Sequence, residues 1–365
     1  MSKASCVVLL SGGLDSVLAA RVLLEQGIEV TGVNFSGAYC PAPFGQKSRA
    51  EKAAEQLGIQ FVKLPIDEGF IELVKAPRYG RGKNMNPCID CHILMVKRAW
   101  EILGQGRSQI SDTRYQIPDI RDQKSDVEFG AVSREPLAAI DFIATGEVLG
   151  QRPMSQNKQS LGVVARRSGT EGRLLRPLSA RLLEPTVPEK EGLVDREKLL
   201  DIRGRSRQRQ IELARAYGIT EFSPPAGGCL LTDAIFSRRL KEALAHKEDT
   251  VEAIELLHLG RHFRLESGNK VIVGRNEPEN EELLARAPKS ATVIDGRNLP
   301  GPVALLLRAD RSDQSDMSDD RTLAARLCAR YSDRREDAAV TVLVAGREAS
   351  VKPLSAEESA ELVVQ

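Results

Sequence analysis

The sequence predicts an α/β protein in which a parallel sheet with helices on both faces precedes a basic region and a smaller α+β domain. Three observations predict this arrangement. Strand-like and helix-like segments alternate over the first hundred residues, a basic segment spans residues 150–215, and the chain beyond residue 234 mixes short strands with helices. A length of 365 residues allows two or three domains, and a hydrophobic content of 41% allows buried cores.

The predicted parallel sheet rests on the order of elements near the start of the chain. Apolar, β-branched runs at 6–10, 28–35 and 60–64 have the length of buried strands, and apolar residues at helical spacing mark helices at 17–26 and 46–57. This βαβαβ order is typical of parallel strands joined by crossover helices. The sequence also predicts a helix at 91–103 and a strand at 141–145.

Two segments interrupt the regular pattern. Residues 104–135 are polar and mixed in charge, with little apolar periodicity, so we expect a mobile insertion there. Residues 313–321 are mostly acidic and predict a loop. Beyond residue 234, helices are expected at 235–245 and 251–259, and strands at 270–273 and 303–307.

The net charge of +1 excludes a globally basic nucleic-acid-binding protein, so any contact with RNA must come from a local patch. Residues 150–215 contain fifteen Lys and Arg against eight Asp and Glu. This excess has two interpretations, a solvated helix face or a track that follows a phosphate backbone. The candidate RNA-binding residues are Arg203, Arg205, Arg207 and Arg209.

Apolar runs in this chain are short. No stretch approaches 18 apolar residues, and the first run ends after five residues at Ser11, so we expect neither a membrane span nor a signal peptide. A cytoplasmic protein is expected. In a reducing compartment, the six cysteines are expected to be thiols or metal ligands rather than disulfides.

The segment Ser-Gly-Gly-Leu-Asp-Ser stands between the first predicted strand and helix. Gly12 and Gly13 lack Cβ atoms, so their amides can closely approach an anion, and the start of the next helix carries partial positive charge. Asp15 would repel a phosphate unless Mg²⁺ or an amide lay between them, which suggests a metal-bridged pyrophosphate. A structural strand–turn–helix corner is the alternative. No Lys follows the second glycine, so this segment is not a Walker loop.

This segment resembles the PP-loop, the SGGxDS signature of the ATP pyrophosphatase superfamily, at every specified position. The resemblance implies a Rossmann-like HUP fold and an enzyme that cleaves ATP between the α and β phosphates. It also implies adenylation of a carbonyl oxygen. By this resemblance, Ser11, Gly12, Gly13, Asp15 and Ser16 hold pyrophosphate and Mg²⁺.

Three cysteines form the second candidate site. Cys88 and Cys91 have C-x-x-C spacing at the start of a predicted helix, where the pKa of a thiol is lowered, and Cys229 follows Gly-Gly far along the chain. The set predicts either a metal or iron–sulfur site with an open position, or a pair for persulfide chemistry. A structural zinc site with His92 as fourth ligand and unrelated core cysteines remain alternatives.

The cysteine segment "NPCIDC" resembles the NPDxxC motif of the tRNA-specific 2-thiouridylases, with Cys91 at the position of the first catalytic cysteine and Cys88 in place of the family aspartate. Cys229 would correspond to the second, although its flanking sequence differs. "DFIATGEV" is similar to the family's D-x-x-ATGH strand, which implies that Thr145 and Gly146 line an adenine pocket. The three cysteines also resemble those of cluster-dependent tRNA thiolases, which implies a [4Fe–4S] cluster on Cys88, Cys91 and Cys229.

The last part of the chain departs from the thiouridylases, because it does not have the pattern of their β-barrel. "GNKVIVGRNEPENEELLARA" and "GRNLPGPVALLL" instead resemble the RNA-binding module of the NFACT proteins; an α+β domain with an incidental turn is the alternative. No loop for S-adenosylmethionine is present, since the strand–glycine–helix unit has the PP-loop form, and this argues against a methyltransferase.

Together these observations predict ATP-dependent tRNA thiolation, with catalytic residues Cys91, Cys229, Cys88 and Asp15. The expected cofactors are ATP and Mg²⁺, with a [4Fe–4S] cluster as one of the alternatives for the three cysteines, and the expected partners are tRNA and a sulfur donor protein or sulfide. The alternatives are an amidating ligase, a small-molecule sulfur transferase and a non-catalytic RNA-binding protein with structural zinc. The expected domains are 1–175 (ATP-binding), 176–233 (basic, with Cys229) and 234–365 (RNA-binding).

Overall fold

The computed structural model describes residues 3–40, 44–103, 140–222, 229–296, 301–309 and 317–364. The expected insertion at 104–135 lies outside these residues. The chain divides into two compact units, one made of Met1–Ser36, Gly45–Gly82 and Asn86–Gly228, and the other of Gly37–Phe44, Lys83–Met85 and Cys229–Gln365. Within the described ranges, no helix is both long and apolar enough to cross a membrane.

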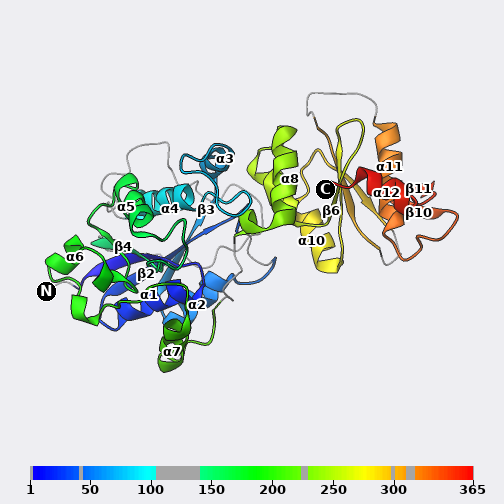
Figure 1. Cartoon of the computed structure of the whole chain (residues 1–365). Coiled ribbons are helices and arrows are strands. Elements are labelled where there is room, and N and C mark those ends of the chain that lie inside the picture. The colour runs from blue at the N-terminus through cyan, green and yellow to red at the C-terminus, as the bar shows by residue number, and fades with distance from the viewer. Residues whose placement is uncertain are drawn as a thin grey trace. The chain divides into compact units, whose positions relative to one another are not determined.

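The first unit is built on a parallel sheet, as the sequence predicts (Figure 1). The strand order is β3-β2-β1-β4-β5, and all four neighbouring pairs are parallel. The elements are β1 (Ser5–Leu9), α1 (Leu14–Leu24), β2 (Glu29–Ser36), α2 (Arg49–Leu57), β3 (Gln60–Pro65), α3 (Glu68–Lys75), α4 (Cys88–Leu103), β4 (Phe142–Thr145), α5 (Lys158–Arg167), β5 (Leu174–Leu175), α6 (Val187–Lys190) and α7 (Gln208–Ala216).

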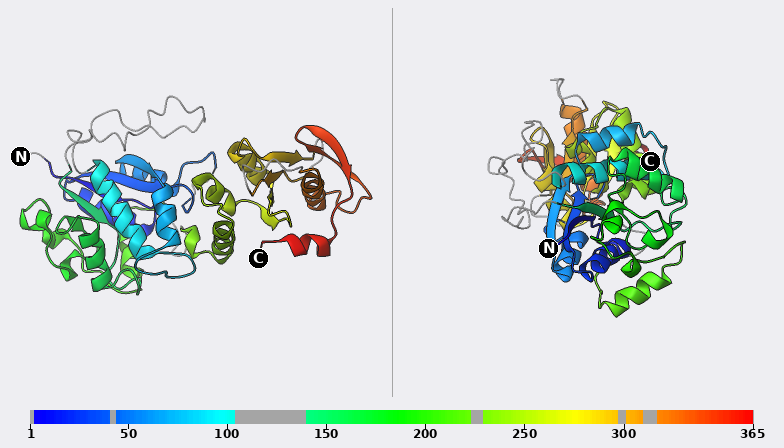
Figure 2. Two further views of the ribbon diagram at one scale, coloured as in Figure 1. Left: turned by 90° about the horizontal axis from the view of Figure 1, so that it is seen from above. Right: turned by 90° about the vertical axis from the view of Figure 1, so that its left-hand side faces the viewer.

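Helices cover both faces of this sheet, and the three views together show them on either side of the strands (Figures 1 and 2). Alternate residues of β1, including Cys6 and Val8, form one core with α1, α2 and α7. Helix α4 contacts β1 and packs against α5, with Val96 and Ala99 fully buried. Both faces are therefore buried, which explains why β1 is a continuous apolar run rather than an alternating one.

Helix α1 starts three residues earlier than the sequence predicts. Gly13 is the N-cap in an extended conformation, and Leu14 opens the helix with its side chain buried. Asp15 lies in the first turn, where a carboxylate is favoured by the helix dipole. The prediction began at Val17 because it counted only the apolar periodicity and treated the polar residues before it as loop.

The second unit carries the predicted α+β domain, with an antiparallel sheet of strand order β11-β10-β8-β9-β7-β6. Met317, which precedes α11, and residues of α11 such as Cys328 pack on one face of this sheet. The elements are α8 (Ala234–Ala245), α9 (Val251–Glu255), β6 (Arg261–Arg264), β7 (Lys270–Val273), α10 (Glu277–Arg286), β8 (Thr292–Asp295), β9 (Ala304–Leu307), α11 (Ser318–Arg330), β10 (Val340–Val344), β11 (Arg347–Val351) and α12 (Ala356–Leu362).

The prediction of a loop at 313–321 is wrong at its end, because α11 begins at Ser318. Asp319 and Asp320 form the first turn of this helix, and acidic side chains are stabilising at a helix N-terminus. The acidic composition that suggested a loop is thus part of a helix start. Residues 313–316 lie outside the described residues.

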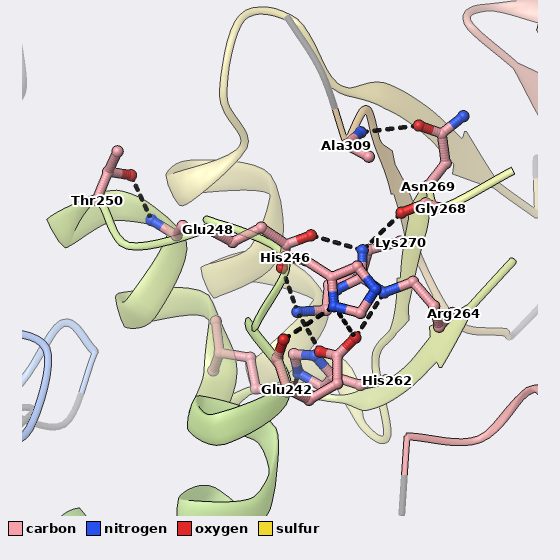
Figure 3. Close-up of polar contacts among 12 residues, drawn as sticks. Glu242, His246, Glu248, Thr250, His262, Arg264, Gly268, Asn269, Lys270 and Ala309 are labelled. Atoms are coloured by element: carbon pink, nitrogen blue, oxygen red, sulfur yellow. Dashed lines mark hydrogen bonds and ion pairs between the residues drawn. The ribbon is translucent and has the colours of Figure 1, made fainter. Parts of the chain in front are cut away.

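A cluster of ion pairs fixes α8 and the segment after it to the β6–β7 hairpin (Figure 3). Nε of Arg264 lies 2.6 Å from Glu242 and its Nη1 lies 2.6 Å from Glu248. Nζ of Lys270 lies 2.6 Å from Glu248 and 3.1 Å from Glu242, although only 2% of the Lys270 side chain is exposed. Two cations and two carboxylates therefore neutralise one another beside the sheet, as buried charges require.

Candidate functional site

The phosphate loop joins β1 to α1, and hydrogen bonds of its own serine hydroxyl groups fix its conformation. Oγ of Ser16 donates a hydrogen bond to the carbonyl of Gly13 at 2.8 Å and accepts one from the amide of Ser11 at 3.2 Å. The two serine oxygens are also 3.2 Å apart. These bonds fix the turn, so the loop amides are arranged before any anion arrives.

Two glycines in this region allow close approaches between segments. A Cβ atom on Gly12, whose φ is +71°, would lie 2.6 Å from the carbonyl carbon of Arg49, at the start of α2. A Cβ atom on Gly146 would lie 2.5 Å from the backbone nitrogen of Ser16. Only glycine fits at either position. The loop after β4 therefore packs directly on the first turn of α1.

The structure brings together the seven residues expected to bind ATP. Ser11, Gly12, Gly13, Asp15 and Ser16 follow β1, and Thr145 pairs with Leu9 where the adjacent strand β4 ends. Gly146 follows and contacts Ser16. In parallel sheets, ligands bind at the carboxyl ends of such neighbouring strands.

Only one of the two carboxylate oxygens of Asp15, Oδ2, has a hydrogen-bond partner among the described residues. Its Oδ2 accepts a hydrogen bond from Nε2 of Gln151 at 2.7 Å and lies 3.7 Å from Nη2 of Arg207. Its Oδ1 is buried and has no hydrogen-bond partner among the described residues. A carboxylate oxygen without a partner at a phosphate loop fits a Mg²⁺ ligand, because Mg²⁺ prefers oxygen ligands and bridges to phosphates.

Cys88 and Cys91 both lie in the first turn of α4, which begins at Cys88 rather than at the predicted residue 91. Both thiols are partly exposed, and Sγ of Cys88 lies 3.2 Å from Oδ1 of Asn86. Oδ1 and Oδ2 of Asp90 accept the amides of Arg78 and Tyr79 at 3.1 and 3.0 Å, which anchors the preceding loop to this turn. Residues three apart in a helix share a face, so the two cysteines can act together.

A polar chain centred on Glu147, which sequence reasoning missed, connects α4 to the loop after β4. Nδ1 of His92 lies 2.7 Å from Oε1 of Glu147, and Nε of Arg176 lies 2.9 Å from Oε2. Thr145 also donates to Oε2 at 3.1 Å. Burial alone would raise the pKa of Glu147, but Arg176 and His92 outweigh it and lower the pKa to about 2. Glu147 is therefore a carboxylate, and Nδ1 of His92 carries the proton between them.

The remaining cysteines are placed differently. Cys6 and Cys328 are buried, and burial raises the pKa of both thiols, that of Cys328 to about 12, so neither is a thiolate at neutral pH. Cys229 is partly exposed and belongs to the second unit, whereas Cys88 and Cys91 belong to the first. Within the described part of the chain, no group of three or more His, Cys, Asp or Glu side chains is placed to hold a metal ion.

The four candidate arginines differ in their surroundings. Arg203 and Arg205 are exposed. Arg209 is also exposed and pairs with Asp201 at 2.8 Å. Arg207 is only 17% exposed and points to Asp15. Leu149 pairs with Arg203 and accepts the amide of Gly204 at 2.8 Å, so this tract runs beside the segment that contacts the phosphate loop.

A cavity of about 380 Å³ is lined by Tyr79, Val163, Arg166 and Arg167. The two arginines lie in the last turn of α5, which packs against the cysteine-bearing helix α4. An aromatic ring beside two guanidinium groups can stack on an unpaired base and bind its phosphate.

Comparison with protein families gives two matches on separate parts of the chain. Residues 4–100 match a family described as the tRNA methyl transferase HUP domain. Residues 260–362 match the family described as the NFACT protein RNA binding domain. The resemblances found in the sequence, to an ATP pyrophosphatase domain of the tRNA-modifying kind and to the NFACT module, are confirmed.

Curated relatives share the first part of the chain. The tRNA-specific 2-thiouridylase of Dehalococcoides mccartyi is 36% identical over 95 residues, which are 24% of this chain and 27% of that protein. The enzyme of the same name from Geobacter metallireducens is 35% identical over 117 residues, 26% and 32% of the two chains. The chain thus spans about a third or less of the length of these relatives. A solved U34-tRNA thiolase from Methanococcus maripaludis with its [4Fe-4S] cluster covers 73% of this chain and 75% of its own, at 14% identity and a low TM-score of 0.27.

Proposed function

We propose that this protein is an ATP-dependent tRNA sulfurtransferase, which adenylates a carbonyl oxygen of a uridine and replaces that oxygen with sulfur. One observation carries the proposal. The helix that bears Cys88 and Cys91 is joined by the His92–Glu147 contact to the loop that packs on the phosphate loop. A thiol pair next to a site for ATP is what thiolation needs and amidation does not. The likeness of residues 4–100 to tRNA-modifying proteins supports tRNA as the substrate class.

The first step uses the phosphate loop. The uridine oxygen attacks the α-phosphorus of ATP, the new O–P bond forms as the bond to pyrophosphate breaks, and a ring nitrogen loses its proton. The amides of the loop and the start of α1 receive the negative charge of the departing pyrophosphate. Asp15 is the residue that would hold Mg²⁺, which neutralises phosphate charge when bound.

The second step uses the thiols. Sulfur carried as a persulfide on Cys91 attacks the activated carbon, and AMP leaves with the electrons of the C–O bond. A thiolate of Cys88 or Cys229 then attacks the sulfur of Cys91, which frees thiouridine and leaves a disulfide. A thiolate is required because the neutral thiol is a poor nucleophile. Sulfide can restore Cys91 by attacking its sulfur in that disulfide, which forms the persulfide and releases the other thiolate. Alternatively, a reductant converts the disulfide to two thiols, and a donor protein's persulfide then transfers its outer sulfur to Cys91 and leaves the donor as a thiol.

Among the described residues, no three His, Cys, Asp or Glu side chains come together around a metal position. A [4Fe–4S] cluster on Cys88, Cys91 and Cys229 is a separate proposal. Anaerobic purification followed by iron, sulfide and zinc analysis tests it. About four irons per chain, lost in each of the three Cys→Ala variants, would support the cluster. Zinc alone would support a structural site instead.

For tRNA binding we propose two surfaces. The exposed Arg203, Arg205 and Arg209 contact phosphates near the ATP site, and residues 260–362 contribute the RNA-binding module. The reacting uridine has to leave its stack to reach the thiols, which favours a loop position in tRNA. The cavity beside Tyr79 suits a neighbouring unpaired base.

The decisive experiment measures pyrophosphate release and thiouridine formation with purified protein, bulk tRNA, ATP and a sulfur donor, supplied in one series as sulfide and in another as a persulfide. Asp15→Asn is expected to abolish pyrophosphate release, because the amide carries no charge for Mg²⁺. Cys91→Ala is expected to keep pyrophosphate release and lose thiouridine. Pyrophosphate release without any sulfur in the tRNA of the wild type would overturn thiolation and leave an amidating or other adenylating enzyme.

A further inference from the structure

We propose that Arg207 is a phosphate-binding residue of the ATP site and not a contact for tRNA. This inference rests on the proposed function in one respect, that ATP binds at the loop after β1. Arg207 would supply the positive charge that the phosphate loop itself lacks, since no lysine follows Gly13.

The position of Arg207 supports this role. It precedes α7, and its guanidinium lies 3.7 Å from Oδ2 of Asp15, in the first turn of α1. The distance leaves the ion pair loose, and Nε of Arg207 is buried with no hydrogen-bond partner among the described residues. A guanidinium has five N–H donors in a fixed fork that matches phosphate oxygens.

The surrounding side chains form a polar wall with unused hydrogen-bonding capacity. Gln210 is fully buried, and its Nε2 donates to Oε1 of Gln151 at 3.0 Å, while Gln151 donates to Asp15 at 2.7 Å. Within the described ranges, Oε1 of Gln210 and Oδ1 of Asp15 have no partner although both atoms are buried. Buried polar atoms without partners are rare and costly, so such a group beside a phosphate loop points to a polar ligand.

Charge decides which ligand fits. The carboxylate of Asp15 alone would repel a triphosphate. A bound Mg²⁺ would neutralise only part of the negative charge of the triphosphate and the carboxylate. Arg207 is the arginine that the structure pairs with Asp15, so it can turn to the phosphates once Mg²⁺ occupies the carboxylate. Its low exposure argues against a tRNA backbone contact, which the exposed Arg203 and Arg205 can make more readily.

Equilibrium binding of Mg·ATP without RNA tests the inference by calorimetry. Arg207→Gln is expected to weaken ATP binding about 10- to 100-fold, the loss expected for one charge-assisted contact. Arg207→Lys should restore part of it. Arg215→Gln is the matched control, because Arg215 is an exposed arginine in the last turn of α7 and lies outside the proposed binding sites. It is expected to bind ATP within about twofold of wild type.

The outcomes separate the two proposals. Wild-type affinity in Arg207→Gln, or an equal loss in Arg215→Gln, would overturn the role of Arg207 and leave the proposed function standing. Wild-type protein that binds no ATP would overturn both. Binding of tRNA by Arg207→Gln, measured in parallel, should match that of wild type. A loss of tRNA binding with intact ATP binding would show that Arg207 contacts tRNA and not ATP. Thermal unfolding checks that each variant is folded.

Discussion

Nδ1 of His92 lies 2.7 Å from Oε1 of Glu147, which is 4% exposed and also binds Arg176. The contact joins the first turn of α4, with its two cysteines, to the loop after β4. Because Glu147 has little exposure, its charge depends on its partners. The helix that carries the two cysteines is thus linked to the loop after β4 by a buried polar network inside the first unit.

Replacing Glu147 should destabilise the first unit. In Glu147→Gln, the buried Arg176 loses its counter-charge, and we expect the free energy of unfolding in urea to fall by about 3 kcal/mol. Glu101→Gln is the control, since the Glu101–Lys97 pair is half exposed with its charges 3.7 Å apart, and a change below about 0.5 kcal/mol is expected. Equal effects of the two substitutions would contradict a structural role for the buried network.

Adding one methyl group at Gly146 should damage the ATP site. In Gly146→Ala, the new Cβ would lie 2.5 Å from the backbone of Ser16, so the loop after β4 must move away from α1. We expect Mg·ATP binding to weaken at least about tenfold, measured by calorimetry. Gly162→Ala, in the interior of α5, meets only the flexible end of Arg166 at 3.3 Å and should bind normally. Unchanged Mg·ATP binding in Gly146→Ala would show that this glycine is not part of the nucleotide site.

Reversing the exposed charges should weaken tRNA binding. The double variant Arg203→Glu and Arg205→Glu removes two phosphate contacts, so the slope of log affinity against log salt should flatten by about 1.8. The double variant Lys3→Glu and Lys52→Glu, at exposed positions before β1 and on α2, is the control, because it changes the net charge by the same amount. A filter-binding series from low to high salt measures both. If the double variant and the control behaved alike, the basic tract would not contact RNA.

The second unit should lose stability in mild acid. Burial, helped by Arg239 and Lys270, holds the pKa of His262 well below 6.5, while its ring bonds the carbonyl of Leu259 at 2.8 Å. The unfolded chain then binds a proton that the folded chain does not, so the stabilising contribution is present above pH 6.5 and is lost as pH falls below it, by up to about 1.4 kcal/mol per pH unit.

His262→Gln should therefore flatten the fall in melting temperature of the full chain between pH 7 and pH 5. His246→Gln is the control, because the His246 ring at the end of α8 is 39% exposed. A melting profile of His262→Gln with the same pH dependence as wild type would assign the acid sensitivity to other groups.

The sequence determined those parts of the molecule that depend on local patterns. Apolar runs such as Val7–Leu10 have the length and β-branched content of buried strands, and their alternation with helices predicts that the strands run parallel. The order β3-β2-β1-β4-β5 came only from the structure. The glycines of the phosphate loop were recognisable because only a few backbone conformations bring amides close to an anion. The α+β character of the chain beyond residue 234 was also predicted, from its mixture of short strands and helices, whereas the antiparallel arrangement of its sheet was seen only in the structure.

Tertiary structure alone decided which distant side chains meet. Glu147 and Arg176 are separated by 29 residues from one another and further still from His92, and no periodicity connects them. Arg207 looked like its neighbours Arg205 and Arg209 in the sequence, yet the path of residues 202–207 along Leu149 turns it toward Asp15. Local patterns fix which residues form a strand or a helix, because they depend on neighbours along the chain. Pairing of buried charges depends on packing between elements, which a single sequence does not display.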